Sequence, residues 1–131
     1  MKNEIKINQI SPKVFEWYLD YLQSVDTRDI ETFSKFLANE CEFQFGNNSG
    51  VKGKTEILEG LKKFWMTYNG EEHVLQNILG NDKCFALEAI NVFQRQDGKE
   101  VSIPAVAITE RNEDGLVISF RVFLDIAPLY A

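Results

Sequence analysis

The spacing of apolar residues in the first half of the chain predicts three helices. Apolar residues recur at three- and four-residue steps over about 12–25, which marks the buried face of a helix. Ser11-Pro12 suits its start, with Ser as the N-cap residue and Pro in the first helical position. Asp26-Thr27 offers a cap for a second short helix over about 30–37, and a third helix is expected over about 55–68.

The second half has the alternation and the turn sequences of β-structure. A short strand at 42–45 comes before it. Because the connections are short, neighbouring strands are expected to be antiparallel. Pro104 lacks a ladder donor and therefore indicates an edge or a bulge. The four β-rich stretches, separated by turns that contain Gly, Asn or Asp, lie at about 72–79, 83–95, 100–111 and 116–126.

Helices followed by a meander of strands predict the α+β class. Three N-terminal helices would pack on a strongly curved antiparallel sheet with a mixed edge, since strands of about twice the usual length must twist and curl. Such a sheet closed by helices gives a cone-shaped fold that encloses a pocket. Residues 1–131 are expected to form one domain, with 1–11 flexible or peripheral.

Composition narrows the classes of function. An apolar fraction of 44% excludes disorder, and a net charge of -6 argues against nucleic-acid binding. No apolar run approaches the roughly 20 residues of a membrane span, and Met1 to Ile10 lacks the apolar core of a secretory signal. Cys41 and Cys84 form no C-x-x-C motif and are expected to be two buried thiols in a reducing cytoplasm.

Several local sequences together resemble one superfamily. The resemblance covers about residues 12–128 and is to the SnoaL-like branch of the nuclear transport factor two-like superfamily, which includes ketosteroid isomerase, limonene epoxide hydrolase, scytalone dehydratase and polyketide cyclases. It implies the cone-shaped fold described above. The sequences that carry it are Arg28-Asp29-Ile30, Phe45-Gly46-Asn47 with Gly53, His73 with Asn77, Asp97-Gly98, and Phe120-Arg121-Val122-Phe123-Leu124-Asp125.

The resemblance implies site residues only in part. Tyr21 falls at the position of the Tyr that donates to the substrate oxyanion in ketosteroid isomerase. His73 falls where scytalone dehydratase and some cyclase-like relatives carry a His that reaches the cavity. The positions of their carboxylates carry no acid here, so steroid isomerisation and epoxide hydrolysis by those residues are not expected. Those positions are Gln44 or Phe45, the neighbourhood of Val106, and Val122.

His73 is the default acid or base because it is the only histidine in the chain. Strand alternation puts Asn77 on the same sheet face, so both would line the pocket; alternatively, His73 lies at a rim or a dimer contact. Glu88 and Asn91 point to opposite faces of their strand, so at most one reaches the pocket. One His without partners makes a metal site improbable.

The remaining candidates are aromatic or amide side chains that could contact a ligand. Tyr18 and Tyr21 lie on the first helix and face the protein core. Each could hydrogen-bond a ligand, or be a core tyrosine whose hydroxyl is bonded within the protein. Trp17 and Trp65 could line a pocket or only pack the core. Asn47 could hydrogen-bond a ligand at the pocket mouth or be a turn residue.

These observations leave two kinds of function open. The first is a cofactor-free isomerase, cyclase or dehydratase that acts on a small hydrophobic substrate through His73 and Tyr21. The alternative is a non-catalytic domain that binds a small molecule or dimerises as a scaffold. A homodimer through the outer sheet face is expected, where Arg121 and Asp125 would lie. No cofactor, nucleic acid or membrane partner is expected.

Overall fold

A computed structural model describes all 131 residues as one mixed seven-stranded sheet with four helices, α+β in class. The predicted three helices precede the main strands, and a fourth short helix that the sequence pattern missed follows the last strand. The elements are β1 (Lys2–Asn8), α1 (Pro12–Asp26), α2 (Ile30–Ser34), β2 (Leu37–Phe45), β3 (Val51–Lys52), α3 (Lys54–Trp65), β4 (Gly70–Gly80), β5 (Cys84–Gln94), β6 (Glu100–Arg111), β7 (Val117–Leu124) and α4 (Ala127–Tyr130).

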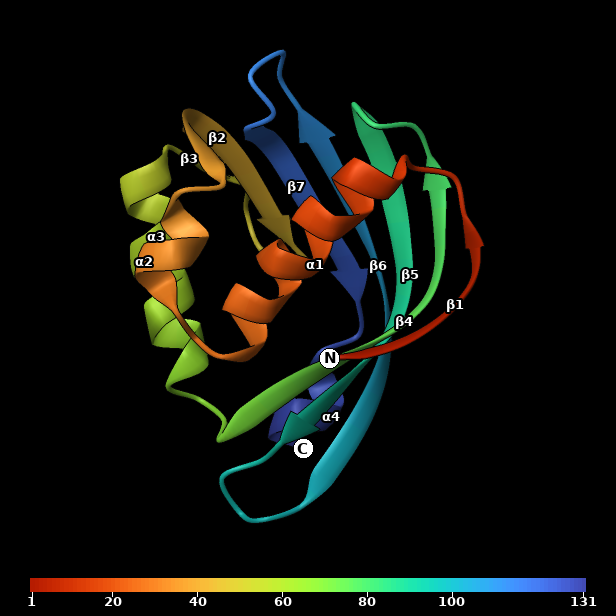
Figure 1. The fold of residues 1–131 in the computed structure, drawn as a ribbon. Helices are drawn as coiled ribbons and strands as arrows, with labels where there is room; N and C mark the ends of the chain where they lie inside the picture. Colours follow the sequence, from red (N-terminus) through yellow and green to blue (C-terminus); the bar gives the residue numbers. More distant parts are fainter.

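The strands are ordered β1-β4-β5-β6-β7-β2-β3. Strands β4 to β7 pair antiparallel as predicted, whereas β1 pairs parallel with β4 and β2 pairs parallel with β7. The sheet curves around α1, and α2 and α3 lie beside α1 near β2 (Figure 1). β1 is an edge strand within the segment 1–11, for which the sequence predicted no element.

Local capping fixes the ends of the first two helices. The Ser11 side chain accepts a hydrogen bond from the Val14 N–H, and Pro12 opens α1. The cap of α2 is Asp29, which accepts from the Thr32 N–H, and not Asp26 or Thr27 as expected. Asp26 is instead the last residue of α1, which leaves its carboxylate free to contact the sheet.

A bulge in β4 decides which of its side chains face the helices. Leu75 pairs with Ala89 and Asn77 with Glu88, so Gln76 is an extra residue without a partner. Alternation therefore changes phase, and Asn77 points away from the helices. The expectation that His73 and Asn77 share a face is wrong for this reason.

Two smaller expectations can be compared with the structure. Pro104 lies in β6 at a point where β7 no longer pairs, because that pairing reaches only to Ala105; β6 is locally an edge there, as predicted. Both cysteines are free thiols, but Cys41 is buried while Cys84 is exposed, so the prediction of two buried thiols is wrong for Cys84. Cys84 opens β5 on the outer face of the sheet.

Candidate functional site

A cavity of about 80 Å³ lies between α1, α3 and the inner face of the sheet. Sixteen of its twenty lining residues are hydrophobic. The space is large enough for a few water molecules and smaller than the roughly 150 Å³ cavity known to admit benzene. The four polar lining residues are Glu71, His73, Asn91 and Thr109.

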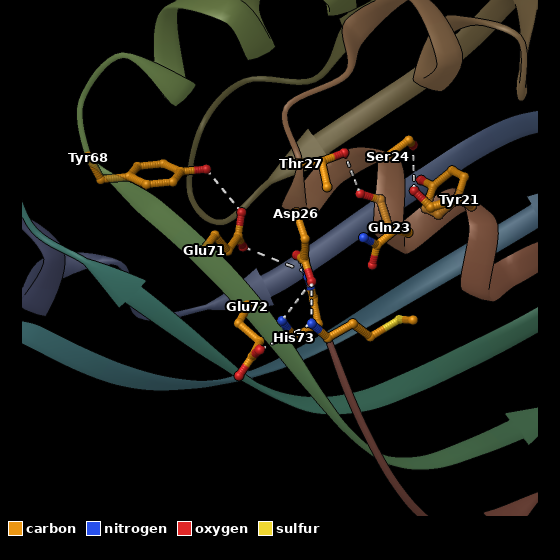
Figure 2. A network of polar contacts seen from close by, with 10 residues as sticks. Tyr21, Gln23, Ser24, Asp26, Thr27, Tyr68, Glu71, Glu72 and His73 are labelled. Atoms are coloured by element: carbon orange, nitrogen blue, oxygen red, sulfur yellow. Dashed lines mark hydrogen bonds and ion pairs between the residues drawn. The ribbon is translucent and has the colours of Figure 1, made fainter.

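His73 is held by a carboxylate from the end of α1. Its Nδ1 lies 2.5 Å from Asp26 Oδ1, and its backbone N–H donates to Asp26 Oδ2 at 3.2 Å (Figure 2). The two side chains are only 11% and 6% exposed. Since Asp26 accepts the Nδ1 proton, the tautomer and the ring orientation are fixed, and Nε2 is the atom left for other chemistry.

Glu71 adds a second carboxyl group on the other side of the imidazole. Its Oε2 lies 3.7 Å from His73 Nε2, and its Oε1 accepts a hydrogen bond from the Tyr68 hydroxyl at 2.9 Å (Figure 2). The Arg28 guanidinium donates to the Tyr68 carbonyl at 2.7 Å and lies over the Tyr68 ring. The site therefore combines the end of α1, the turn after α3 and the start of β4.

The three acidic and basic groups shift one another's proton affinity. Burial alone would lower the pKa of His73, but the charges of Glu71 and Asp26 and the Asp26 hydrogen bond outweigh it and raise the pKa. Burial opposes ionisation of Asp26, yet the hydrogen bond and charge of His73 leave the Asp26 pKa lowered. Burial raises the pKa of Glu71. Asp26 and His73 thus form an ion pair, beside a carboxyl group that binds a proton more readily than a free one.

Five predicted site residues line the cavity. His73 and Asn91 face each other across β4 and β5, and Trp65 closes the α3 side. Tyr18 and Tyr21 project from α1 and are 0% and 5% exposed. Burial raises the pKa of both phenols, so each keeps its proton near neutrality.

Four predicted ligand contacts lie outside the cavity. Trp17 is half-buried beneath the Arg111 guanidinium, 4.2 Å from the ring centroid. Asn47 is an exposed residue of the turn after β2. Asn77 donates to Glu88 at 2.8 Å on the outer sheet face, because of the β4 bulge. Of the pair Glu88 and Asn91, alternation on β5 therefore brings only Asn91 to the cavity.

Sequence reasoning missed Asp26 and Glu71. Asp26 was interpreted as a local cap, and its contact with His73 spans 47 positions, which no local pattern reports. Glu71 carried a usable signal, since side chains two positions apart lie on one strand face, and Glu71 therefore shares the face of His73. Thr109, 1% exposed on β6, was missed in the same way.

No three His, Cys, Asp or Glu side chains are arranged in a group able to hold a metal ion. None of the four helices combines the length and the apolar character required to cross a membrane.

Comparison of sequences finds no protein-family model and no curated protein that matches the chain. Comparison of structures finds many similar folds. A protein assigned as a SnoaL-like polyketide cyclase from Shewanella denitrificans OS-217 superposes with a TM-score of 0.78 at 14% identity, covering 89% of this chain and 93% of that one. An LEH-like epoxide hydrolase from M. tuberculosis superposes with a TM-score of 0.74 at 14% identity, covering 90% of this chain and 86% of that one.

A third similar structure contains a ligand. TerC, co-crystallised with polyporic acid, superposes with a TM-score of 0.77 at 14% identity, covering 89% of this chain and 95% of that one. The chain therefore has the fold shared by the SnoaL-like and NTF2-like proteins, as the sequence resemblance implied. The neighbours differ in activity, so the fold alone does not select a reaction.

Proposed function

We propose that this protein is a cofactor-free enzyme that moves a proton on a small hydrophobic substrate, as an isomerase, cyclase or dehydratase would. The observation that carries the proposal is the buried Asp26–His73 pair, with Glu71 beside it, at the wall of an otherwise apolar cavity. Buried ionisable groups are costly to keep, and they gather where proton transfer needs them.

His73 Nε2 is the proposed site of proton exchange with the substrate. Asp26 holds the Nδ1 proton and stabilises the imidazolium, from which Nε2 can give a proton to the substrate and then take one back. Glu71, whose pKa burial raises, can hold the second proton or return one at another substrate atom. Tyr21 is the proposed donor that orients a substrate oxygen, supported by its position on the cavity wall.

A ring-sized substrate requires the cavity wall to shift. A surface groove of about 150 Å³ lies between α3 and the loop after β2. It shares four lining residues with the cavity, Phe43, Phe45, Leu61 and Phe64. Rotation of one of these aromatic side chains would join the two spaces, which makes this shared wall the proposed entrance.

The proposal can be tested without knowing the natural substrate. Ring ketones and hydroxylated aromatic ketones are incubated with the protein in D₂O, and deuterium incorporation at carbon is followed by NMR. The wild type should accelerate exchange for at least one compound, and His73→Ala should reduce that rate by a factor of about 10² or more. Glu88→Gln, on the outer face, is the matched control. An exchange rate unchanged in His73→Ala would contradict the role of His73.

A non-catalytic binding protein is the second candidate. It is favoured by the side chains at the positions where related enzymes carry acids: Val122 lines the cavity, and Gln44, in β2, donates to the Gly46 carbonyl of the loop that follows. Native mass spectrometry of the purified protein distinguishes the two candidates. A retained ligand that is recovered unchanged after prolonged incubation, with no exchange for any compound, would favour binding alone.

We also propose a homodimer through the outer sheet face, acting in the cytoplasm. Three large apolar side chains, Leu79, Val106 and Phe123, are 44%, 37% and 48% exposed. Val106 and Phe123 lie together on β6 and β7 and border one groove. Sedimentation should give a dimer for the wild type and a monomer for Phe123→Asp, because a buried unpaired charge opposes association.

A further inference from the structure

Two buried polar groups in the cavity wall have no hydrogen-bond partner. The Tyr18 hydroxyl belongs to a side chain that is 0% exposed, and it makes no hydrogen bond of standard geometry, with the Thr109 side chain as a polar neighbour. The Oδ1 atom of Asn91, whose residue is 4% exposed, is likewise unpaired. Both residues line the cavity. Since buried polar groups in folded proteins are nearly always paired, each of these two groups calls for a specific explanation.

The contrast with the other polar groups nearby makes the two unpaired atoms informative. Asp26 and His73 bind each other, and Tyr68 donates to Glu71. In the cavity wall the charged groups are thus paired, whereas the Tyr18 hydroxyl and Asn91 Oδ1 are not. These two uncharged groups can therefore form hydrogen bonds with a ligand inside the cavity.

The two groups line the cavity from different elements. Asn91 on β5 is the register partner of His73, so its amide lies beside the imidazole. Tyr18 lies on α1, two turns before Asp26, with its ring 4.7 Å from that of Phe85 and 5.5 Å from that of Tyr21. Apart from Glu71, His73, Asn91 and Thr109, the residues that line the cavity are hydrophobic. A molecule that satisfies both groups therefore needs two polar atoms with an apolar part between them.

The chemistry of each group limits what it can accept. Burial raises the pKa of Tyr18 more than the nearby Thr109 side chain lowers it, so the phenol remains a neutral donor. The Asn91 amide offers both an acceptor and a donor. A carboxylate or phosphate in the cavity would lie near Glu71 and Asp26 without a free cation to balance it, since His73 is already paired. An ammonium group would have to compete with His73 for the same carboxylates.

We propose that Tyr18 and Asn91 are the recognition residues of the cavity, and that the ligand is an uncharged ring compound with a carbonyl for the Tyr18 hydroxyl and a hydroxyl for the Asn91 amide. This inference rests on the proposed function in one respect only, that the cavity is the ligand site. It adds two residues that determine specificity and the polarity of the molecule that they select.

A matched set of small probes tests the proposal. 4-Hydroxyacetophenone carries both polar groups, acetophenone only the carbonyl, benzoate a negative charge and benzylamine a positive one. Dissociation constants are measured by NMR titration with wild type, Tyr18→Phe and Asn91→Leu. Each substitution removes the unpaired atoms and keeps most of the side-chain volume, so both variants should fold; an amide ¹H–¹⁵N spectrum checks this, and Asn91→Ala is the second choice.

The wild type should bind 4-hydroxyacetophenone about tenfold more tightly than acetophenone, and benzoate or benzylamine more weakly than either. Tyr18→Phe should weaken both ketones about fivefold to tenfold, the effect of one neutral hydrogen bond. Asn91→Leu should weaken only the hydroxylated ketone. Equal affinity of all proteins for both ketones, tighter binding of a charged probe, or no binding of any probe would overturn the proposal.

The outcome is separable from that of the proposed function. If the variants bind like the wild type while His73→Ala abolishes deuterium exchange, recognition by Tyr18 and Asn91 is wrong and the acid–base role of His73 stands. If the variants weaken binding while exchange is indifferent to His73→Ala, the recognition residues stand and the proposed catalysis fails.

Discussion

Two cross-strand pairs on the same two strands differ completely in their surroundings. His73 and Asn91 are register partners on β4 and β5 that face the cavity, whereas Asn77 and Glu88 are partners on the outer face. The outer pair satisfies itself with one hydrogen bond of 2.8 Å in contact with solvent. The inner pair does not bond to itself: His73 is held by α1, and the Asn91 amide stays free.

The comparison shows how one inserted residue separates a solvent-facing pair from a site. If Gln76 paired with Glu88 in a regular register, alternation would place Asn77 on the face of His73. In the apolar interior, burial disfavours protonated His73, and the charge of Glu71 together with the charge and hydrogen bond of Asp26 outweighs this and raises the His73 pKa. The outer pair, Asn77 and Glu88, is stabilised by contact with solvent and therefore has no comparable consequence for chemistry.

The largest loss of stability is expected when Asp26, the residue of α1 that binds His73, loses its charge. Asp26→Asn leaves a buried imidazole without its carboxylate and should cost roughly 3 kcal/mol of unfolding free energy at pH 6. Urea denaturation measures it. Glu88→Gln, the matched change in the outer pair, should cost less than about 0.5 kcal/mol. Similar losses in the two variants would contradict the distinction between the faces.

The second prediction concerns pH. Because the pKa of His73 is raised on folding, the ion pair contributes stability below the ordinary pKa of His, and that contribution disappears as pH rises through the folded value. Glu71→Gln removes a charge that raises the pKa of His73, so the NMR titration midpoint of His73 should fall and the loss of stability should begin at lower pH. A midpoint unchanged in Glu71→Gln would show that Glu71 is not ionised beside His73.

Removal of an unpaired buried hydroxyl should not lower folding stability, whereas removal of a paired one should lower it. Tyr18→Phe takes away a buried hydroxyl without a partner and should leave stability unchanged or raise it by up to about 1 kcal/mol. Tyr68→Phe takes away the donor to Glu71 and should destabilise by about 1 kcal/mol. Thermal unfolding of both variants under one condition measures the contrast. A marked loss for Tyr18→Phe would mean that its hydroxyl bonds to the protein.

The smallest effect is expected from the bulge itself. Deletion of Gln76 would restore regular pairing while Ile78 keeps its inward position, because the extra residue alone is removed. The fold and the orientation of His73 should be preserved, with a modest change in stability. The amide spectrum of β4 and β5 checks this. Loss of the fold would show that the bulge is required by the parallel pairing of β1, which is also irregular at this point.

Local patterns predicted much of the fold, and long-range contacts explain the failures. The cap and the apolar face of α1 depend on residues within one or two turns, so the sequence shows them. β1 was missed because its parallel partner, β4, lies some seventy residues away. Asp26 was missed for the same reason, whereas Asn77 was misplaced because alternation assumes a strand without bulges.

The central claim is that His73 presents Nε2 to a ligand while Asp26 holds Nδ1. A long-range ¹H–¹⁵N spectrum of the imidazole, recorded with and without 4-hydroxyacetophenone, tests it directly. The account predicts a proton that stays on Nδ1 in both spectra and an Nε2 resonance that moves on addition of the ketone. An Nε2 resonance that does not respond to a bound ketone, or an Nδ1 without its proton, would contradict it.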